Sequence, residues 1–352
     1  MTQVKSKFTL DLTQRPRRLR TSQAMRDLVA DVTLSAKNFI MPYFVVSGRE
    51  QVQPIHALPG VSRFSVDKLM PEIERALNLS IKSVMLFGVV DSSEKTPDGK
   101  ASSSINGPVA SALREARLQF GNDLVLMTDV CLCGYTDHGH CGVLKPTQKG
   151  IVIDNDKSLE HLATMALVHA EAGADVVSPS DMMDGRVAAI RQTLDNEGFS
   201  DVSILSYAVK YASAFYGPFR EAAGSSPSKS ETLDNWMIPP KDRKSYQMDF
   251  RNSRSALREV ELDMLEGADM LMVKPALAYL DVIANVRATT SLPVVAYNVS
   301  GEYAMFKAAA SVGALDEALA VTESLLAMRR AGADLIISYY GTEVLEKGWL
   351  SN

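Results

Sequence analysis

Lys274 ends an apolar run of the sequence and could act as a nucleophile. Residues 269–275 read Asp-Met-Leu-Met-Val-Lys-Pro, the pattern of a buried strand that is stopped by a proline. Desolvation of a lysine at the end of a strand lowers its pKa, and the free amine can attack a carbonyl to form a Schiff base. The alternative is a lysine whose ammonium reaches back to water from the strand end.

A second lysine occupies the equivalent place in another strand-like run. Lys210 closes the segment Ser203–Lys210. If the two strands are neighbours, both amines enter one pocket, each lowers the pKa of the other, and two carbonyl substrates could be bound. The alternative is that one lysine pairs with a carboxylate such as Asp129 or Asp181.

All three cysteines of the chain lie within one short, glycine-rich segment. Cys131 and Cys133 are followed by Cys141, which is a spacing unlike that of a disulfide framework. Three soft ligands suit zinc, and a three-ligand site leaves one coordination position open to water or substrate, as catalytic zinc requires. A structural zinc site completed by His138 or His140 is the alternative.

The elements that must position these groups alternate between strand-like and helical patterns. Amphipathic segments such as Asp67–Asn78, Leu159–Ala172 and Glu317–Arg330 separate short apolar runs, which is typical of a parallel sheet with helices on its faces. Eight such runs predict a (β/α)8 TIM barrel: Ile40–Val46, Ser83–Val89, Leu124–Val130, Asp175–Ser180, Ser203–Val209, Asp269–Pro275, Pro293–Val299 and Asp334–Tyr340.

A repeated turn supports the barrel over a doubly wound sheet. The segments 171–175, 266–269 and 331–334 each contain Gly-Ala-Asp between a helical pattern and a strand, where glycine suits a left-handed helix end. A doubly wound sheet would carry a phosphate-binding glycine motif after its first strand, and Val45–Glu50 has none. In a barrel the strand ends share one face with the active site. The polar residues at these ends are Asp129, Ser180, Asp181, Lys210, Lys274, Ser300, Tyr339 and Tyr340.

A long loop follows Lys210 and could cover the mouth of the barrel. It runs from about Glu221 to Met248, which is long enough for a lid, and it contains Arg243 and Gln247. Together with Arg220, which precedes the loop, two arginines over the mouth would suit carboxylate recognition through paired hydrogen bonds. Ordinary surface arginines are the alternative.

Composition narrows the class of protein. The 352 residues are 46% hydrophobic and 22% charged, and the formal net charge of −5 argues against a nucleic-acid partner. No segment has membrane-spanning length and residues 1–8 lack a signal-peptide pattern, so we expect a cytoplasmic protein without membrane contact. Residues 1–32, with the basic run Arg15–Arg20, are expected to form an arm that contacts a neighbouring subunit, and residues 33–352 the barrel.

The sequence closely resembles the porphobilinogen synthase (5-aminolevulinate dehydratase) family over nearly its whole length. The resemblance rests on Arg15-Pro-Arg-Arg-Leu-Arg20, Asp129-Val-Cys-Leu-Cys133, Ser180-Asp-Met-Met-Asp-Gly-Arg186, Phe215-Tyr-Gly-Pro-Phe-Arg220, Met272-Val-Lys-Pro275 and Val299-Ser-Gly-Glu302. It implies a lyase of tetrapyrrole (heme) biosynthesis that condenses two 5-aminolevulinate molecules to porphobilinogen with loss of two waters.

The same resemblance implies a role for each strand-end group. Lys274 would form a Schiff base with the substrate that becomes the propionate side of the product, and Lys210 with the acetate-side substrate. Ser300 and Tyr339 would hold the first carboxylate; Arg220, Arg243 and Gln247 the second; and Asp129, Ser180 and Asp181 would line the pocket and assist proton transfer. The cysteines resemble the zinc-dependent branch, since other members carry aspartates at the positions of Cys131 and Cys133. The stretch Ser228–Pro240 departs from the family pattern as an insertion in the lid.

Two further expectations come from the resemblance. Glu259 matches the position where some members bind an allosteric magnesium ion, although it could be an ordinary helix carboxylate like Glu261 or Asp263 nearby. The assembled form would be a homo-octamer. Two competing interpretations remain. One is a class I aldolase, which also uses a Schiff-base lysine on a barrel but needs neither paired lysines nor a three-cysteine loop. The other is a zinc-stabilised binding barrel with the lysines as surface groups.

Overall fold

The computed structural model describes residues 12–148, 150–227 and 239–351 and divides the chain into two units, Met1–Thr33 and Leu34–Asn352. The first unit contains the short helices η1 (Pro16–Arg20) and α1 (Gln23–Leu28), neither of which has a buried residue. The Ser22 side chain caps α1 by accepting a hydrogen bond of 3.1 Å from the Met25 amide.

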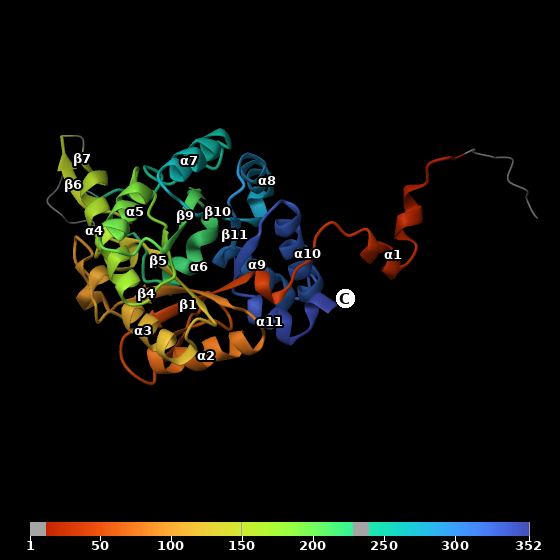
Figure 1. Cartoon of the computed structure of the whole chain (residues 1–352), viewed down its shortest axis with the longest axis horizontal. Helices are drawn as coiled ribbons and strands as arrows, with labels where there is room; N and C mark the ends of the chain where they lie inside the picture. The colour runs from red at the N-terminus through yellow and green to blue at the C-terminus, as the bar shows by residue number, and fades with distance from the viewer. Residues whose placement is uncertain (1–11, 149, 228–238, 352) are drawn as a thin grey trace, which may run out of the picture. The chain divides into compact units, whose positions relative to one another are not determined.

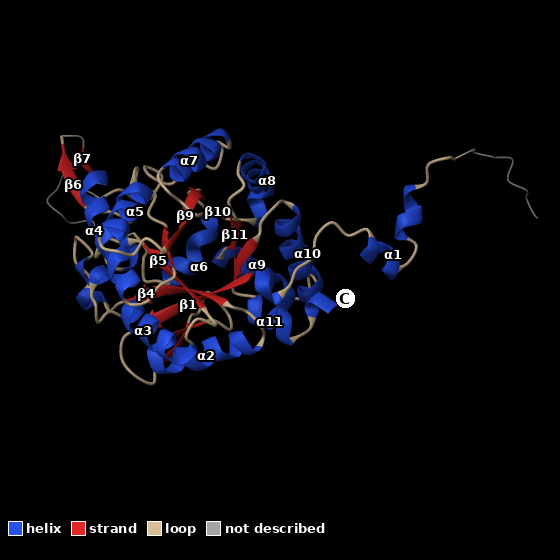
Figure 2. Cartoon of the chain, in the orientation of Figure 1, coloured by secondary structure: helices blue, strands red, loops and turns tan. Residues whose placement is uncertain are grey.

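The second unit is built on a closed parallel barrel, which confirms the predicted fold (Figures 1 and 2). Closure is made by the pairing of the last strand with the first, in which Phe39 lies opposite Ile336. Each predicted strand run overlaps one barrel strand, although β1 begins at Phe39, before its predicted run, and β9 ends at Lys210, after its predicted run. In chain order the barrel strands are β1 (Phe39–Val46), β4 (Ser83–Val89), β5 (Val125–Val130), β8 (Val176–Pro179), β9 (Ser203–Lys210), β10 (Met270–Lys274), β11 (Val294–Asn298) and β12 (Leu335–Ser338).

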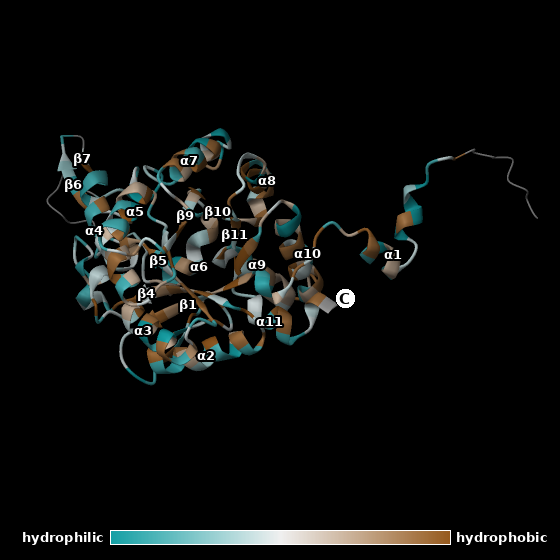
Figure 3. Ribbon diagram, viewed as in Figure 1, coloured by the Kyte–Doolittle hydropathy of each residue, from teal (hydrophilic) through white to brown (hydrophobic). Residues whose placement is uncertain are grey.

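Most of the helices surround these strands, because the longer ones carry an apolar stripe that packs toward the strands (Figures 2 and 3). In α2, for example, Leu69, Met70, Ile73 and Ala76 are buried, and Figure 3 shows that the same helix also carries hydrophilic residues. The helices are α2 (Val66–Asn78), α3 (Pro108–Phe120), α4 (Asn155–Glu171), α5 (Arg186–Asn196), α6 (Gly217–Ala222), α7 (Arg254–Leu265), α8 (Leu280–Thr289), α9 (Ser300–Ser311), α10 (Glu317–Arg330) and α11 (Gly341–Glu346).

The three Gly-Ala-Asp turns have the predicted left-handed glycine, with φ of +105° at Gly173, +102° at Gly267 and +113° at Gly332. The aspartate that follows has a use that the sequence pattern did not indicate. Its carboxylate accepts a hydrogen bond from a backbone amide of another strand, for example at 2.7 Å from Ile204 to Asp269. In the same way, the Leu126 amide donates a hydrogen bond to the Asp175 carboxylate, and the Val294 amide donates one to the Asp334 carboxylate.

Two small hairpins are added to the barrel. In the first, β2 (Val52–Pro54) pairs antiparallel with β3 (Ser62–Ser65), which continues the sheet beside β1. In the second, β6 (Leu144–Thr147) pairs with β7 (Gly150–Ile153) just after the cysteine segment. None of the helices within the described ranges is long and apolar enough to cross a bilayer.

Candidate active site

The two lysines lie side by side at the ends of adjacent strands. Lys274 of β10 and Lys210 of β9 are direct partners in the strand register, and their side chains are almost fully buried, with 4% and 5% exposure. The Lys210 ammonium donates a hydrogen bond to the Ser180 carbonyl at the end of β8. The barrel register therefore brings together two amines that are 64 residues apart by sequence number (274 − 210).

Aromatic rings enclose the amine of Lys274. Its Nζ lies 4.0 Å from the ring centre of Tyr297, 4.8 Å from Phe219 and 5.1 Å from Tyr207. Burial, together with the nearby Lys210, lowers the pKa of Lys274 to about 7. The amine is therefore partly neutral near physiological pH. Sequence reasoning missed these rings, which come from strands and a helix that are distant along the chain.

Carboxyl groups complete the lysine pocket. Burial raises the pKa of Asp129 to about 6 against the opposing effect of Lys210, and its carboxyl hydrogen-bonds the Ser180 side chain. Burial also raises the pKa of Asp181 to about 6, and one of its oxygens accepts a 2.7 Å bond from the Met183 amide. Among the described residues no direct ion pair joins either lysine to Asp129 or Asp181, although the charge of Lys210 acts to lower the pKa of both carboxyls.

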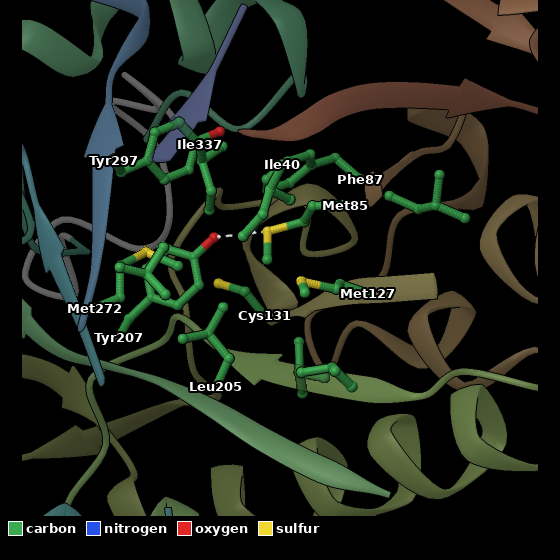
Figure 4. Packing of buried hydrophobic residues seen from close by; sticks show 14 of the residues in the cluster. Ile40, Met85, Phe87, Met127, Cys131, Leu205, Tyr207, Met272, Tyr297 and Ile337 are labelled. Carbon is green, nitrogen blue, oxygen red and sulfur yellow. Dashed lines mark hydrogen bonds between the residues drawn. The ribbon is translucent and has the colours of Figure 1, made fainter. Parts of the chain in front are cut away.

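The three cysteines converge beside this pocket. Their Sγ atoms all lie within 4.8 Å of one another, and all three residues are buried. Figure 4 shows the Cys131 side chain among barrel side chains that include Tyr207 and Met127. Hydrogen bonds from the Cys131 and Cys141 thiols hold the pKa of Cys133 well below its usual range. Thiolate sulfurs around one zinc ion would be roughly 3.8 Å apart, so the cluster fits a metal of this size.

Neither neighbouring histidine is available to that cluster. His140 Nε2 lies 2.8 Å from the Pro240 carbonyl and its Nδ1 lies 3.1 Å from the Tyr246 hydroxyl. His138 Nε2 lies 3.0 Å from the Pro97 carbonyl, and its Nδ1 accepts a bond from the His140 amide. With both ring nitrogens of each histidine engaged, the described ligand set consists of the three sulfurs.

The two arginines and the glutamine keep buried polar atoms without a partner among the described residues. These atoms are Nε of Arg220, Nε of Arg243 and both side-chain polar atoms of Gln247. Burial and the guanidinium of Arg243 lower the pKa of Arg220, which places the two cations near each other. Buried polar groups are normally satisfied, so this cluster has the character of a site for an anionic ligand.

The second half of the predicted lid is tied to the cysteine segment. Arg243 donates to the Gly139 carbonyl at 2.8 Å, and the Tyr246 hydroxyl accepts from the Cys141 amide at 3.4 Å. Residues 228–238, which contain most of the predicted insertion 228–240, lie outside the described residues. Sequence reasoning missed Tyr246 because its partners are about a hundred residues away.

The start of the same loop is fixed by another residue that sequence reasoning missed. Arg63 of β3 donates to the carbonyls of Glu221 and Ala222, each at 2.6 Å. A cation on these carbonyls stabilises the carboxyl end of α6, the helix that carries Phe219 and Arg220. No local pattern around Arg63 could reveal this contact.

Ser300 and Tyr339 contact residues that surround Lys274. The Ser300 hydroxyl accepts a 2.9 Å bond from the Phe219 amide and donates to the Phe215 carbonyl at 3.3 Å. The hydroxyl of Tyr339 lies 3.5 Å from that of Tyr297. Both residues therefore belong to the same end of the barrel as the lysines.

Glu259 lies on the helix α7 and not at the end of a strand. Burial raises the pKa of Glu259; Arg186 opposes this effect, and the carboxylates of Asp263 and Asp184 add to it. The described structure does not place Glu259 in a cluster of three or more close metal ligands. Its expected role therefore remains a prediction.

Comparison with known proteins identifies the family. The model of the family "Delta-aminolevulinic acid dehydratase" matches residues 13–347. A relative of that name from Methanothermobacter thermautotrophicus is 50% identical over 335 residues, which is 95% of this chain and 97% of the relative. The Escherichia coli relative is 48% identical over 337 residues, or 96% of this chain and 98% of the relative. The chain belongs to the delta-aminolevulinic acid dehydratase family.

A solved structure of the family has the same fold. The delta-aminolevulinic acid dehydratase (porphobilinogen synthase) of Toxoplasma gondii, in complex with the reaction product porphobilinogen, superimposes with a TM-score of 0.89 at 45% identity and covers 96% of this chain and 92% of its own. The family resemblance stated from the motifs is confirmed. In this dehydratase chain, two buried amines and a three-thiol cluster stand at the end of one barrel.

Proposed function

We propose that the chain is a porphobilinogen synthase that condenses two 5-aminolevulinate molecules through Schiff bases on Lys274 and Lys210. The observation that carries the proposal is the pair of buried amines on adjacent strands, because each can bind one ketone substrate. Holding both substrates on neighbouring strands makes the condensation effectively intramolecular.

Lys274 is the better placed nucleophile. Its neutral amine would attack the substrate ketone, the carbonyl oxygen would leave as water, and an imine of the propionate-side substrate would remain. The pKa near 7 supplies the neutral form, and the surrounding rings limit the access of water. Lys210 would bind the acetate-side substrate in the same way.

Two separate groups would hold the substrate carboxylates. Ser300 begins α9, where the helix dipole favours an anion, and Tyr339 stands on the next strand end. Arg220, Arg243 and Gln247 would hold the other carboxylate, and their unpartnered buried atoms support this assignment.

Three polar residues would handle protons and the substrate amine. Asp129 and Asp181 both have a pKa near 6, so each can accept and return a proton close to neutral pH. Ser180 hydrogen-bonds Asp129 and contributes the carbonyl that accepts from Lys210, which links the carboxyl to the second amine.

We infer that Cys131, Cys133 and Cys141 hold a zinc ion. Three buried sulfurs that lie close together, without an available histidine, support zinc over magnesium, which prefers oxygen ligands. Zinc bound there would supply a Lewis acid beside the lysine pocket. Arg243 adds a cation next to the thiolates and joins the lid to this segment.

We further propose that Glu259 anchors an allosteric magnesium ion and that the arm joins subunits into a cytoplasmic homo-octamer. Magnesium keeps several waters and needs only one or two protein carboxylates, and Asp263 and Asp184 lie near enough to Glu259 to raise its pKa. Arginines at positions 15, 17, 18 and 20 would contact the neighbour near this hydrated ion.

Reductive trapping tests the catalytic proposal. Borohydride reduction with 5-aminolevulinate should attach the substrate to Lys274, as located by mass spectrometry. Lys274→Ala should reduce turnover by several orders of magnitude, while Lys68→Ala, which removes an exposed lysine on α2, should leave it unchanged. A class I aldolase or a binding barrel would not yield this adduct, and substantial turnover by Lys274→Ala would refute the assignment.

A further inference from the structure

One buried carboxylate connects the loops that follow two neighbouring barrel strands. Glu302, in the first turn of α9, is 1% exposed. Its carboxylate accepts hydrogen bonds from the Leu277 amide at 2.8 Å, the Asn298 side chain at 3.0 Å and the Val299 amide at 3.0 Å. The Ala276 amide is a further donor. All these partners are N–H groups.

The donors lie next to groups of the lysine pocket. Ala276 and Leu277 follow Lys274 in the loop after β10, and Val299 immediately precedes Ser300. Glu302 therefore fixes two backbone segments: the one that follows Lys274 and the one that leads into Ser300. Because the carboxylate is fully buried, it holds both loops without competition from water.

The same network reaches the next strand. The Asn298 side chain, held by Glu302, accepts a 2.9 Å bond from the Ser338 hydroxyl, which itself accepts a 3.1 Å bond from the Tyr340 amide. These last two residues flank Tyr339. One chain of buried hydrogen bonds thus spans the ends of β10, β11 and β12.

We propose that Glu302 is a positioning residue that sets the distance between the Lys274 amine and the carboxylate site formed by Ser300 and Tyr339. It would act through these groups and not by contact with the substrate. The inference rests on the proposed function, since it concerns the substrate bound to Lys274, and it assigns a role to a residue outside the lysines, cysteines and carboxylate-binding groups. Lys210 and its arginine cluster lie outside this network and serve as the internal reference.

The chemistry of the donors requires a carboxylate. An amide in its place would keep one acceptor oxygen and would turn an NH2 group toward N–H donors, so at least one loop would be released. Aspartate would keep the charge but is one methylene shorter, so it could not reach both loops. Glu302→Gln should therefore impair positioning most, and Glu302→Asp should restore part of it.

The experiment measures trapping on each lysine separately. Wild type, Glu302→Gln and Glu302→Asp are reduced with borohydride at low 5-aminolevulinate, and the adducts on Lys274 and Lys210 are quantified by mass spectrometry, alongside KM, kcat and Tm. We expect Glu302→Gln to slow trapping on Lys274 and to raise KM, with a loss of up to about 100-fold, as a displacement of about 1 Å can cause. Trapping on Lys210 should stay near the wild-type rate.

Glu343→Gln is the matched control. Glu343 on α11 also accepts hydrogen bonds from α9, at 2.7 Å from Lys307, but its described donors are Lys307 and Lys347, and neither belongs to the hydrogen-bond network of Glu302. This variant should lower Tm without changing either trapping rate. If Glu302→Gln does not fold, Asn298→Ala takes its place, since it cuts the link to Ser338 and should raise KM.

Each result decides the proposal. The proposal is overturned if a folded Glu302→Gln protein traps substrate on Lys274 at the wild-type rate. It is also overturned if trapping falls equally on both lysines and in proportion to the fall in Tm. An unchanged KM for Asn298→Ala, where that variant is needed, would overturn it as well. Failure of the wild type itself to form the Lys274 adduct would instead refute the proposed function, and this role with it.

Discussion

At the scale of single residues, the reactivity of Lys274 is determined by competition between two effects of its surroundings. The aromatic rings attract a cation through their faces, but they also exclude the water that would solvate an ammonium. Desolvation prevails, with help from Lys210, and the pKa falls to about 7. The amine is thus partly neutral near pH 7, as a nucleophilic lysine requires.

This balance predicts the pH dependence of imine formation. The neutral fraction of the Lys274 amine rises with pH, so brief reductive trapping with substrate should increase through about pH 7 and level off above it. In Lys210→Met, loss of the neighbouring cation should move the midpoint to higher pH. Lys347→Met, which removes an exposed lysine, is the control at each pH. If the midpoint does not move in Lys210→Met, then Lys210 does not lower the pKa of Lys274.

At the scale of elements, α6 connects the lysine pocket to the lid. Its Phe219 ring contacts the Lys274 amine, its Arg220 belongs to the cluster of unpartnered polar atoms, and its last carbonyls are held by Arg63. The other half of the loop is joined through Arg243 to the cysteine segment. The two arginines that we propose for carboxylate recognition are therefore held by different parts of the barrel.

Replacing either arginine by lysine should weaken binding of the second substrate. Arg220→Lys and Arg243→Lys keep the charge but lose the planar fork, and a hydrogen bond to a charged group contributes about 1.5–3 kcal/mol. Apparent KM should rise roughly tenfold or more in each, as read from the substrate dependence of the initial rate. Arg251→Lys, at an exposed position just beyond the loop, is the control, and identical curves for all three variants would rule out the assignment.

At the scale of the whole molecule, the strand pairing that closes the barrel does not depend on the three cysteines. Parallel strands pair around the whole barrel, whereas the cysteines lie in the segment after β5 and pack against the apolar core. Chelation should therefore stop turnover while far-ultraviolet circular dichroism and Tm stay close to those of the metal-loaded protein. Full activity of the metal-free protein would show that zinc is not needed for catalysis. A large fall in Tm on chelation would show that zinc has a structural role instead.

Assembly should respond to protein concentration and magnesium together, because subunit association follows mass action. If Glu259 anchors the ion, magnesium should shift wild type toward the larger species in size-exclusion chromatography and raise its activity on dilution, and Glu259→Ala should lose this response. Glu261→Ala, on an exposed position of the same helix, should keep it. The anchor is excluded if wild type and Glu259→Ala respond alike.

Local patterns in the sequence were sufficient to predict the barrel strands, the glycine turns between helices and strands, and the polar residues that stand at the strand ends. These features follow from hydrophobic periodicity and backbone preferences over a few residues, and the motifs carried the family resemblance. Only the tertiary structure decided that Lys210 lies beside Lys274 in the strand register and that aromatic rings from several elements enclose the Lys274 amine. It also decided that His138 and His140 are hydrogen-bonded to groups other than the thiols, and that Glu302 holds two loops. Such contacts depend on strand register and on residues far apart in the chain, and neither is encoded in any short segment.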